Sequence, residues 1–386
     1  MKNIITTNQK PIKCWLDNIE ESALAQANNL ANLPFTFKHV ALMPDCHVGY
    51  GMPIGAVLAT KDVVIPNAVG VDIGCGMCAV STNLKDIPKD KLLEIVNKIK
   101  RSVPVGFKHQ KEPQDIALMP VCDERHPIVN KEFYSARHQL GTLGGGNHFI
   151  EIQKDNDGVV WIMNHSGSRN LGKKVADHYN KEAVKLNERW FSKVEKSMEL
   201  AFLPIDTEQG KQYLNEMQYC IDFALANRKL MMERIKACFA KVLTDVSFGD
   251  MINIAHNYAA FENHFGCNVI VHRKGATYAG QGNIGIIPGS QGTKSYIVRG
   301  LGNPESFFSC SHGAGRRMGR KEAQRKLDLK SEIKLMEEKG IIHGIKTVSD
   351  LDEAASAYKD IDVVMQNQQD LVEIVVELSP LAVIKG

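Results

Sequence analysis

The chain has 386 residues, 44% of them hydrophobic and 24% charged, and 47 basic against 44 acidic residues leave a net charge of +3. This composition excludes a disordered or collagen-like chain and suffices for a large buried core. The near-neutral charge gives no sign of a nucleic-acid binder, and nine cysteines do not make a disulfide scaffold. Because no leader-like start or membrane-length apolar run is present, we expect a cytoplasmic globular protein with reduced thiols and no membrane partner.

In chain order, the glycines gather in four patches, at 49–76, 141–146, 275–302 and 313–315. The β-like runs occur at 56–59, 159–163, 268–272, 295–298 and 371–378, and the tail is 383–386. A helical stretch is predicted from about 171 to 260, with breaks near 203–204 and 248–249, because apolar residues such as Tyr213, Met217 and Cys220 recur at helical spacing. No linker divides the chain. The predicted fold is therefore α+β, a single mixed domain over 1–386 with a helical hairpin inserted at about 171–260, and its sites should lie on glycine-rich loops at strand ends.

The first motif whose side chains could bind a metal or react is a tight glycine turn that carries Asp72, Cys75 and Cys78. Asp72 and Cys75 stand three residues apart and can face one cation. The two cysteines also match the C-x-x-C pattern of redox centres and half zinc sites, but no second compact pair completes a structural zinc site. We favour a metal site that uses Asp72 and Cys75, with redox use and plain buried thiols as alternatives.

Three histidines each lie beside an asparagine, in Asn147-His148, Asn164-His165 and His256-Asn257. Each histidine alone would be read as a core residue, and we expect His256 on or at the end of a helix. Together with Asp72 and Cys75 they supply one carboxylate, one thiolate and three imidazoles, a set that suits two ions sharing a bridging thiolate. Such pairs of ions support phosphoryl transfer, and ligand softness alone favours zinc.

Two further segments suit a phosphorylated or nucleotide ligand. Arg273 and Lys274 precede a glycine turn, and a hydroxyl-rich glycine loop runs over 288–295. No Gly-Lys-Ser/Thr closes this loop, so it is not a Walker A motif. The alternative is that the glycine and hydroxyl residues of this loop only form turns and bind no ligand.

His312 lies in a glycine-rich segment that is expected to open a basic helix. Residues 313–330 hold seven basic residues against two acidic ones, and we expect Arg317, Lys321 and Arg325 on one helix face. A histidine at a helix N-terminus among glycines and guanidinium groups would meet a bound phosphate, and its imidazole could attack phosphorus. A solvated basic helix with a capping histidine is the alternative.

Taken together, these segments resemble the RtcB family of GTP-dependent RNA ligases, also called tRNA-splicing ligases. The resemblance runs from Met43 to Gly386, and the spacing is similar to that of the compact bacterial form. The motifs that carry it are 70–76, 144–151, 165–169, 256–257, 288–295 and 312–316, in family order. Gly319 departs from the family pattern, in which many members have a small polar residue, and this difference concerns only contacts with RNA.

The resemblance implies two manganese ions, one held by Asp72, Cys75 and His148, the other by Cys75, His165 and His256. It also implies that His312 attacks the α-phosphate of GTP and becomes guanylylated. The residues implied to surround the guanylate are Asn147, His148, Glu151, His256, Asn257, Pro288, Gly289, Ser290, Gln291, Ser295, His312, Gly313, Ala314, Gly315 and Lys385.

The implied reaction joins an RNA end bearing a 2′,3′-cyclic phosphate or a 3′-phosphate to a 5′-hydroxyl end through a 3′-guanylylated RNA, in RNA repair or tRNA splicing. The residues expected to contact RNA are Asp45, His47, Arg169, Arg316, Arg317 and Arg320, and for Asp45 and His47 a structural role in a turn is an equal alternative. We expect a monomer, and an activator such as archease fits the family without being implied by the sequence. The alternative functions are a metal-dependent phosphoesterase and a non-enzymatic metal or redox RNA-binding protein.

Overall fold

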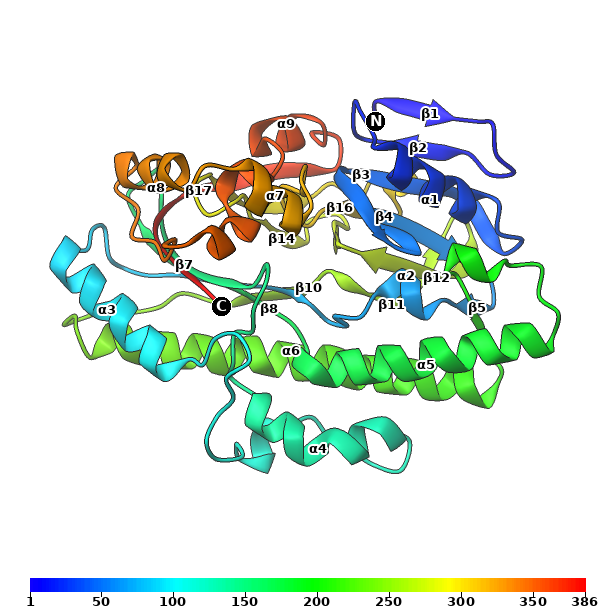
Figure 1. Ribbon diagram of the computed structural model, residues 1–386, viewed down its shortest axis with the longest axis horizontal. Coiled ribbons are helices and arrows are strands. Elements are labelled where there is room, and N and C mark those ends of the chain that lie inside the picture. Colours follow the sequence, from blue (N-terminus) through cyan, green and yellow to red (C-terminus); the bar gives the residue numbers. More distant parts are fainter.

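Two β-sheets lie above a pair of long antiparallel helices in the computed structural model, which describes residues 1–386 (Figure 1). The first sheet contains, in spatial order, β1 (Asn3–Ile5), β2 (Ile12–Cys14), β3 (Thr36–Tyr50), β4 (Met52–Thr60), β12 (Cys267–Lys274) and β11 (Asn257–His264). The second contains β10 (Ile252–Ala255), β6 (Gly76–Ser81), β8 (Val160–Ser166), β7 (Phe149–Asp155), β17 (Val372–Lys385), β15 (Ser295–Gly300) and β14 (Ile284–Ile287). Two small ladders pair β13 (Ala276–Tyr278) with β16 (Ser309–Ser311) and β5 (Val63–Val64) with β9 (Leu203–Pro204).

The helices surround these sheets, and none of them is long and apolar enough to span a membrane. They are α1 (Glu21–Ala31), α2 (Pro66–Val69), α3 (Lys89–Ser102), α4 (Pro127–Gln139), α5 (Arg169–Arg189), α6 (Glu208–Ala240), α7 (Arg320–Lys326), α8 (Leu329–Glu338) and α9 (Ile361–Gln366). Mixed helices and sheets in one large unit confirm the predicted α+β class. Each predicted β-like run overlaps a strand, with Val159 and Leu371 just outside β8 and β17, and the tail belongs to β17 up to Lys385.

The longest helix, α6, holds the second sheet in place. It has 33 residues, and the Thr207 hydroxyl caps its start by accepting a hydrogen bond from the Gly210 N–H at 3.1 Å. The predicted helical spacing is confirmed, because Tyr213, Met217 and Cys220 are all buried on this helix. The fully buried guanidinium of Arg228 donates to the carbonyls of Gly74 and Ser166, both at 2.8 Å, so α6 is bonded directly to the predicted metal-site turn.

The predicted helical range of 171–260 is wrong beyond residue 240. The helices end at Ala240, and residues 252–255 and 257–264 form β10 and β11. Ile252 and Ile254 alternate along a strand that pairs with β6. The hydrogen bonds of this pairing stabilise a strand although the same apolar residues would also fit a helix. His256 therefore does not lie on a helix but between two strands that belong to different sheets.

Sheet register brings the predicted metal-binding segments to one place. In β8, His165 pairs with Met77 of β6 on one side and with Phe149 of β7 on the other. Because β6 and β7 both run antiparallel to β8, they begin at the same end of it. Cys75 directly precedes β6 and His148 directly precedes β7, so the ladder places both residues beside His165.

Candidate metal and nucleotide site

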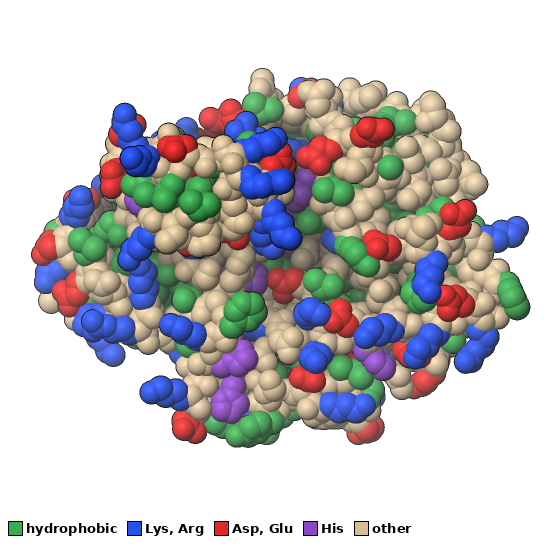
Figure 2. All heavy atoms as spheres, in the orientation of Figure 1, with side chains coloured by type: hydrophobic (Ala, Val, Ile, Leu, Met, Phe, Trp, Pro, Cys, Tyr) green, Lys and Arg blue, Asp and Glu red, His purple; other side chains and the backbone are tan.

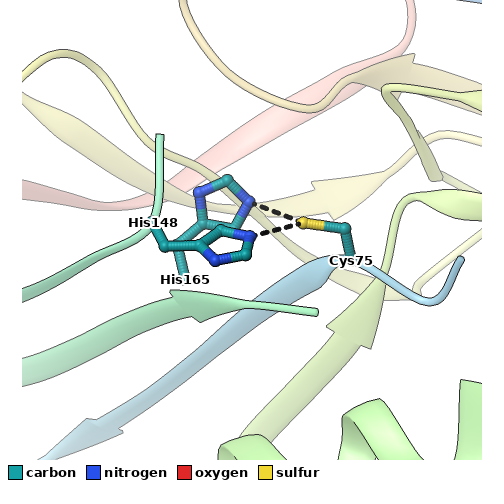
Figure 3. A group of neighbouring side chains, drawn as sticks. All are labelled: Cys75, His148 and His165. Atoms are coloured by element: carbon teal, nitrogen blue, oxygen red, sulfur yellow. Dashed lines mark hydrogen bonds between the residues drawn. The ribbon is translucent and has the colours of Figure 1, made fainter. Parts of the chain in front are cut away.

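Cys75, His148 and His165 form a buried group at the start of the second sheet (Figure 3). The Cys75 sulfur lies 3.4 Å from Nε2 of His148 and 3.2 Å from Nε2 of His165. One donor atom of each residue lies within 4.8 Å of the donor atoms of the other two. One thiol and two imidazoles so arranged are a ligand set suited to a transition-metal ion.

Asp72 and His256 extend this group on either side. The Asp72 carboxylate lies 3.0 Å from Nε2 of His148, and Nε2 of His256 lies 3.3 Å from Nε2 of His165. The structure thus brings together the five residues that the sequence singled out as metal ligands. The chain Asp72–His148–Cys75–His165–His256 has the thiol in its centre, where a sulfur could contact two ions.

Burial sets the protonation of these groups. It lowers the pKa of both His165 and His256 well below the ordinary value, so both imidazoles are neutral, the form that binds metal. Burial, with the Asp72 charge, raises the pKa of the Cys75 thiol. Burial alone would raise the pKa of Asp72 as well, but the hydrogen bond and charge of His148 outweigh it and hold this pKa below its usual value.

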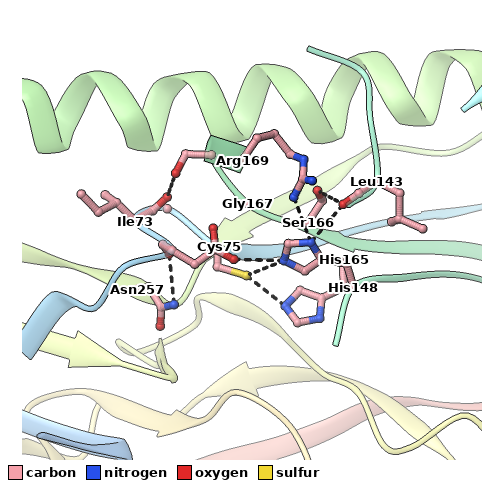
Figure 4. A network of polar contacts seen from close by, with 12 residues as sticks. Ile73, Cys75, Leu143, His148, His165, Ser166, Gly167, Arg169 and Asn257 are labelled. Carbon is pink, nitrogen blue, oxygen red and sulfur yellow. Dashed lines mark hydrogen bonds and ion pairs between the residues drawn. The ribbon is translucent and has the colours of Figure 1, made fainter. Parts of the chain in front are cut away.

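A second layer of hydrogen bonds orients the group (Figure 4). Nδ1 of His148 lies 3.0 Å from the Leu143 carbonyl, and this contact orients the ring with Nε2 toward Asp72 and Cys75. The Asn257 amide donates to the Asp72 carbonyl at 3.1 Å. These bonds tie the ligand-bearing turn to strand β11 and fix the orientation of the His148 ring.

The other cysteine of the C-x-x-C pattern lies in a different environment. Cys78 is fully buried among apolar residues on β6, in a cluster with Val80, Ile162 and Met231, and it is a free thiol. Burial raises its pKa to about 12. A reactive redox pair needs an accessible, acidified thiol, so the structure does not favour the redox reading of this motif.

His312 stands beside the group and is held by a buried carboxylate. Asp45 of β3 is fully buried, and one of its oxygens accepts hydrogen bonds from His312 Nδ1 at 2.6 Å and from the His312 backbone N–H at 3.1 Å. The His312 ring centroid lies 4.8 Å from that of His256. Burial would raise the pKa of Asp45, but the charge and hydrogen bond of His312 outweigh it and keep the pKa low.

The expected basic helix begins later than predicted. His312 follows β16 in an irregular segment, and α7 begins only at Arg320, so His312 is not at a helix N-terminus and Arg317 does not share a helix face with Lys321 and Arg325. Gly315 has φ +73° and lies so close to the Asp45 carbonyl that a Cβ would overlap it. Gly315 thus serves the contact with β3 and not a helix start.

A cavity of about 440 Å³ opens between the two sheets, a size within the range of small-molecule sites. Most of the residues expected around a guanylate line it: Asn147, Glu151, His256, Asn257, Pro288, Gly289, Ser290, Gln291, His312, Gly313, Ala314, Gly315 and Lys385. His148 and Ser295 do not line it. Ser295 lies behind the wall, where its hydroxyl accepts from the Gly289 N–H at 3.2 Å and stabilises the loop.

Glu353 is a residue that the sequence did not reveal. Its buried carboxylate faces Arg316 at 3.1 Å, Arg320 at 2.9 Å and Lys385 at 3.7 Å on one wall of the cavity. Burial would raise the pKa of Glu353, but these cations outweigh it and lower it. Glu353 follows a run of ordinary polar residues, so no motif marks it.

The residues expected to contact RNA differ in exposure. Arg317 and Arg320 are exposed, and Figure 2 shows Lys and Arg side chains gathered above the central hollow, over α7. Arg316 is largely committed to Glu353, and Arg169 lies 3.3 Å from Nδ1 of His148. His47 is buried on the cavity wall, where burial lowers its pKa to about 4, and it lies 2.9 Å from the Asp45 carbonyl.

The site thus combines a buried group that suits a transition metal, a cavity of small-molecule size and an oriented histidine, as in an enzyme active site. The family model described as tRNA-splicing ligase RtcB matches residues 26–132 and 121–386. The RNA-splicing ligase RtcB of Escherichia coli strain K12 is 39% identical over 412 residues, covering 99% of both chains. The tRNA-splicing ligase RtcB of Nanoarchaeum equitans is 34% identical, covering 95% of this chain and 92% of the relative.

The chain therefore belongs to the RtcB family. This result confirms the resemblance found in the sequence. The family match covers residues 26–386, which include the glycine loops, the second sheet, the first sheet from β3 onward and the long helices.

Proposed function

We propose that the chain is an RNA ligase that uses GTP to join a 2′,3′-cyclic phosphate or 3′-phosphate RNA end to a 5′-hydroxyl RNA end. Two relatives that match almost all of the chain are named as RNA-splicing or tRNA-splicing ligases, which supports the ligase class. The observation that carries the mechanism is the Asp45–His312 pair at the edge of a cavity that four of the five potential metal ligands line, all except His148.

In the first proposed step, Nε2 of His312 attacks the α-phosphorus of GTP. A phosphorus–nitrogen bond forms, the bond to the bridging α–β oxygen breaks, and pyrophosphate leaves. Asp45 supports this role because its carboxylate accepts a hydrogen bond from Nδ1–H of His312 at 2.6 Å. The Nε2 lone pair is then free for attack, as in other histidines oriented by a carboxylate.

Metal ions are part of the proposal. The imidazoles, the carboxylate and the central thiol of the buried group would hold two manganese ions, one by Asp72, Cys75 and His148 and the other by Cys75, His165 and His256. Bound ions would stabilise negative charge that develops on the phosphoryl oxygens. Zinc binds thiolate and imidazole ligands more tightly than manganese, so it would compete for the same residues.

The remaining steps consume the guanylate. Water opens a cyclic phosphate to a 3′-phosphate, whose oxygen takes the GMP group from His312 and regenerates the free imidazole. The 5′-hydroxyl then attacks the activated 3′-phosphate, and GMP leaves as a 3′–5′ phosphodiester forms. Backbone at Gly289 and Gly313 and the side chains of Asn147 and Lys385 line the cavity, and they support a role in holding the guanylate.

Labelled GTP tests the proposal. Protein incubated with Mn²⁺ and GTP labelled at the α-phosphate should form a covalent adduct that is labile in acid and stable in base. The adduct should disappear in His312→Ala and persist in His178→Ala, which changes an exposed histidine on α5. If wild-type protein forms no adduct with Mn²⁺, Mg²⁺ or Zn²⁺, the nucleotidyl mechanism is wrong. Phosphate release that needs no GTP and survives His312→Ala would indicate a phosphoesterase.

A further inference from the structure

A long irregular segment is anchored beside the cavity. Residues 103–126 join α3 to α4 with only one short helix, η1 (Ile116–Leu118), between them. The Leu143 N–H donates to the Pro104 carbonyl at 2.9 Å, and the Gly106 N–H donates to the Gly144 carbonyl at 2.8 Å. These bonds attach the segment to the glycine loop that leads into Asn147 and His148. Loops of this length in a compact domain usually carry function.

This segment presents aromatic side chains to solvent. Phe107 directly follows the anchor and is fully exposed, at 104%, and His109 is exposed two residues later. On α4, Tyr134 is 67% exposed, and its ring lies edge-on to that of His138 at 5.1 Å. We call the four residues Phe107, His109, Tyr134 and His138 the aromatic strip.

The strip is held together by one main-chain hydrogen bond and one contact of the His138 ring with the main chain. The Gln110 N–H donates to the His138 carbonyl at 2.8 Å, and Nδ1 of His138 lies 3.1 Å from the Gln110 carbonyl. These contacts fix the loop against the end of α4. Figure 2 shows histidine and apolar side chains next to one another below the central hollow, over the loop that precedes α4.

Two lysines beside the first ring of the strip could contact a polyanion, in a segment that also holds the exposed acidic residues Glu112 and Asp115. Lys108 and Lys111 are exposed and have no ion-pair partner in the structure. A fully exposed phenylalanine contributes no burial to folding stability, so the fold does not explain it. The aromatic rings of the strip alternate with histidine and lysine side chains, whereas the centre of a protein–protein interface is mainly apolar. The strip therefore does not have the composition of a protein-binding surface. Aromatic faces beside cations are, in contrast, the surface on which single-stranded nucleic acid stacks.

We propose that the aromatic strip binds a single-stranded part of the RNA substrate, with bases stacked on Phe107 and Tyr134 and phosphates beside Lys108 and Lys111. RNA as the substrate rests on the proposed function. The anchor at Gly144 places the strip where a strand leaving the cavity past Asn147 would cross it.

Binding of a fluorescein-labelled single-stranded RNA with a 3′-phosphate, measured by anisotropy, tests the strip. Stacking on one ring predicts about tenfold weaker binding for Phe107→Ala, little change for Phe107→Trp, and the loss again for Phe107→Leu. Phe191→Ala is the matched control, because Phe191 is also exposed, at 92%, and lies past the far end of α5. A Lys108→Ala/Lys111→Ala variant should reduce the salt dependence of binding.

Formation of the GMP adduct needs no RNA and should be unchanged in Phe107→Ala. If wild-type protein makes the adduct but Phe107→Ala binds RNA as tightly as wild type, the strip proposal is wrong and the proposed function stands. Stacking would also be contradicted if Phe191→Ala lost as much RNA affinity as Phe107→Ala, or if Phe107→Leu bound RNA as tightly as wild type. If wild type makes no adduct, the proposed function fails, and the strip is judged by RNA binding alone.

Discussion

The carboxylate of Asp45 and the imidazole of His312 are joined by a hydrogen bond of 2.6 Å although the residues lie 267 positions apart in the chain. Asp45 comes from the first sheet, whereas His312 follows the small ladder formed by β13 and β16. The carboxylate is fully buried, so water cannot replace the imidazole as its partner. The pair therefore fixes both the orientation and the tautomer of the histidine.

Asp45→Asn should slow guanylylation by about a hundredfold or more while leaving the fold intact. An asparagine amide can turn its N–H₂ toward Nδ1, which would move the ring proton to Nε2 and remove the nucleophilic lone pair. The single-turnover rate of adduct formation from labelled GTP measures the effect. Asp177→Asn, on the exposed face of α5, is the control and should react at the wild-type rate. A wild-type rate in Asp45→Asn would show that the carboxylate does not orient the nucleophile.

Metal binding should stabilise the protein through Cys75 and not through Cys78. A ligand at a hundred times its Kd adds about 2.7 kcal/mol to the free energy of unfolding, so saturating Mn²⁺ should raise Tm by several degrees. Cys75→Ala should abolish this rise, because it removes the central donor of the group. Cys78→Ala lowers core packing three residues away but should keep the rise, since Cys78 faces apolar residues. Equal rises in the two variants would contradict the assignment of Cys75.

Local patterns in the sequence predicted the ligand-rich turns, the long helices and five of the seventeen strands, because these depend on neighbouring residues. The convergence of Cys75, His148 and His165 also follows from strand pairing once the family is recognised. Contacts between segments that are far apart in the chain could not be predicted from the sequence. Neither the bond from His312 to Asp45 nor the role of Glu353 has a local signal, and His256 was misplaced because its flanking apolar residues fit a helix as well as a strand.

Glu353→Gln should destabilise the protein by about 3 kcal/mol or more. The change leaves Arg316, Arg320 and Lys385 without their shared buried carboxylate, and breaking a buried ion pair typically costs 3–5 kcal/mol. Glu373→Gln is the matched control. It removes a pair with Arg299 in which both side chains are about half exposed, and it should cost less than about 1 kcal/mol. Urea unfolding of the three proteins measures both differences, and equal losses would mean that Glu353 has no special structural role.

Lys274 gives the protein a specific dependence of stability on pH. Its buried ammonium donates to the carbonyls of Tyr50 at 2.5 Å and Asn67 at 3.0 Å, and so connects the β3–β4 turn to α2. Burial lowers the pKa of Lys274 from 10.5 to about 7. Between these two values the unfolded chain binds a proton that the folded chain does not, so this residue makes the free energy of unfolding rise with pH.

Lys274→Met removes this titration. The difference in unfolding free energy between wild type and Lys274→Met should therefore stay constant below about pH 7 and grow by up to about 1.4 kcal/mol per pH unit above it. Urea unfolding at pH 6, 7, 8 and 9 measures this slope, and Lys181→Met, on the exposed face of α5, should show a constant difference. Parallel stability curves for wild type and Lys274→Met would mean that Lys274 stays protonated in the folded protein. The two carbonyls of Tyr50 and Asn67 would then hold a buried charge, and Lys274→Met would remove it equally at every pH.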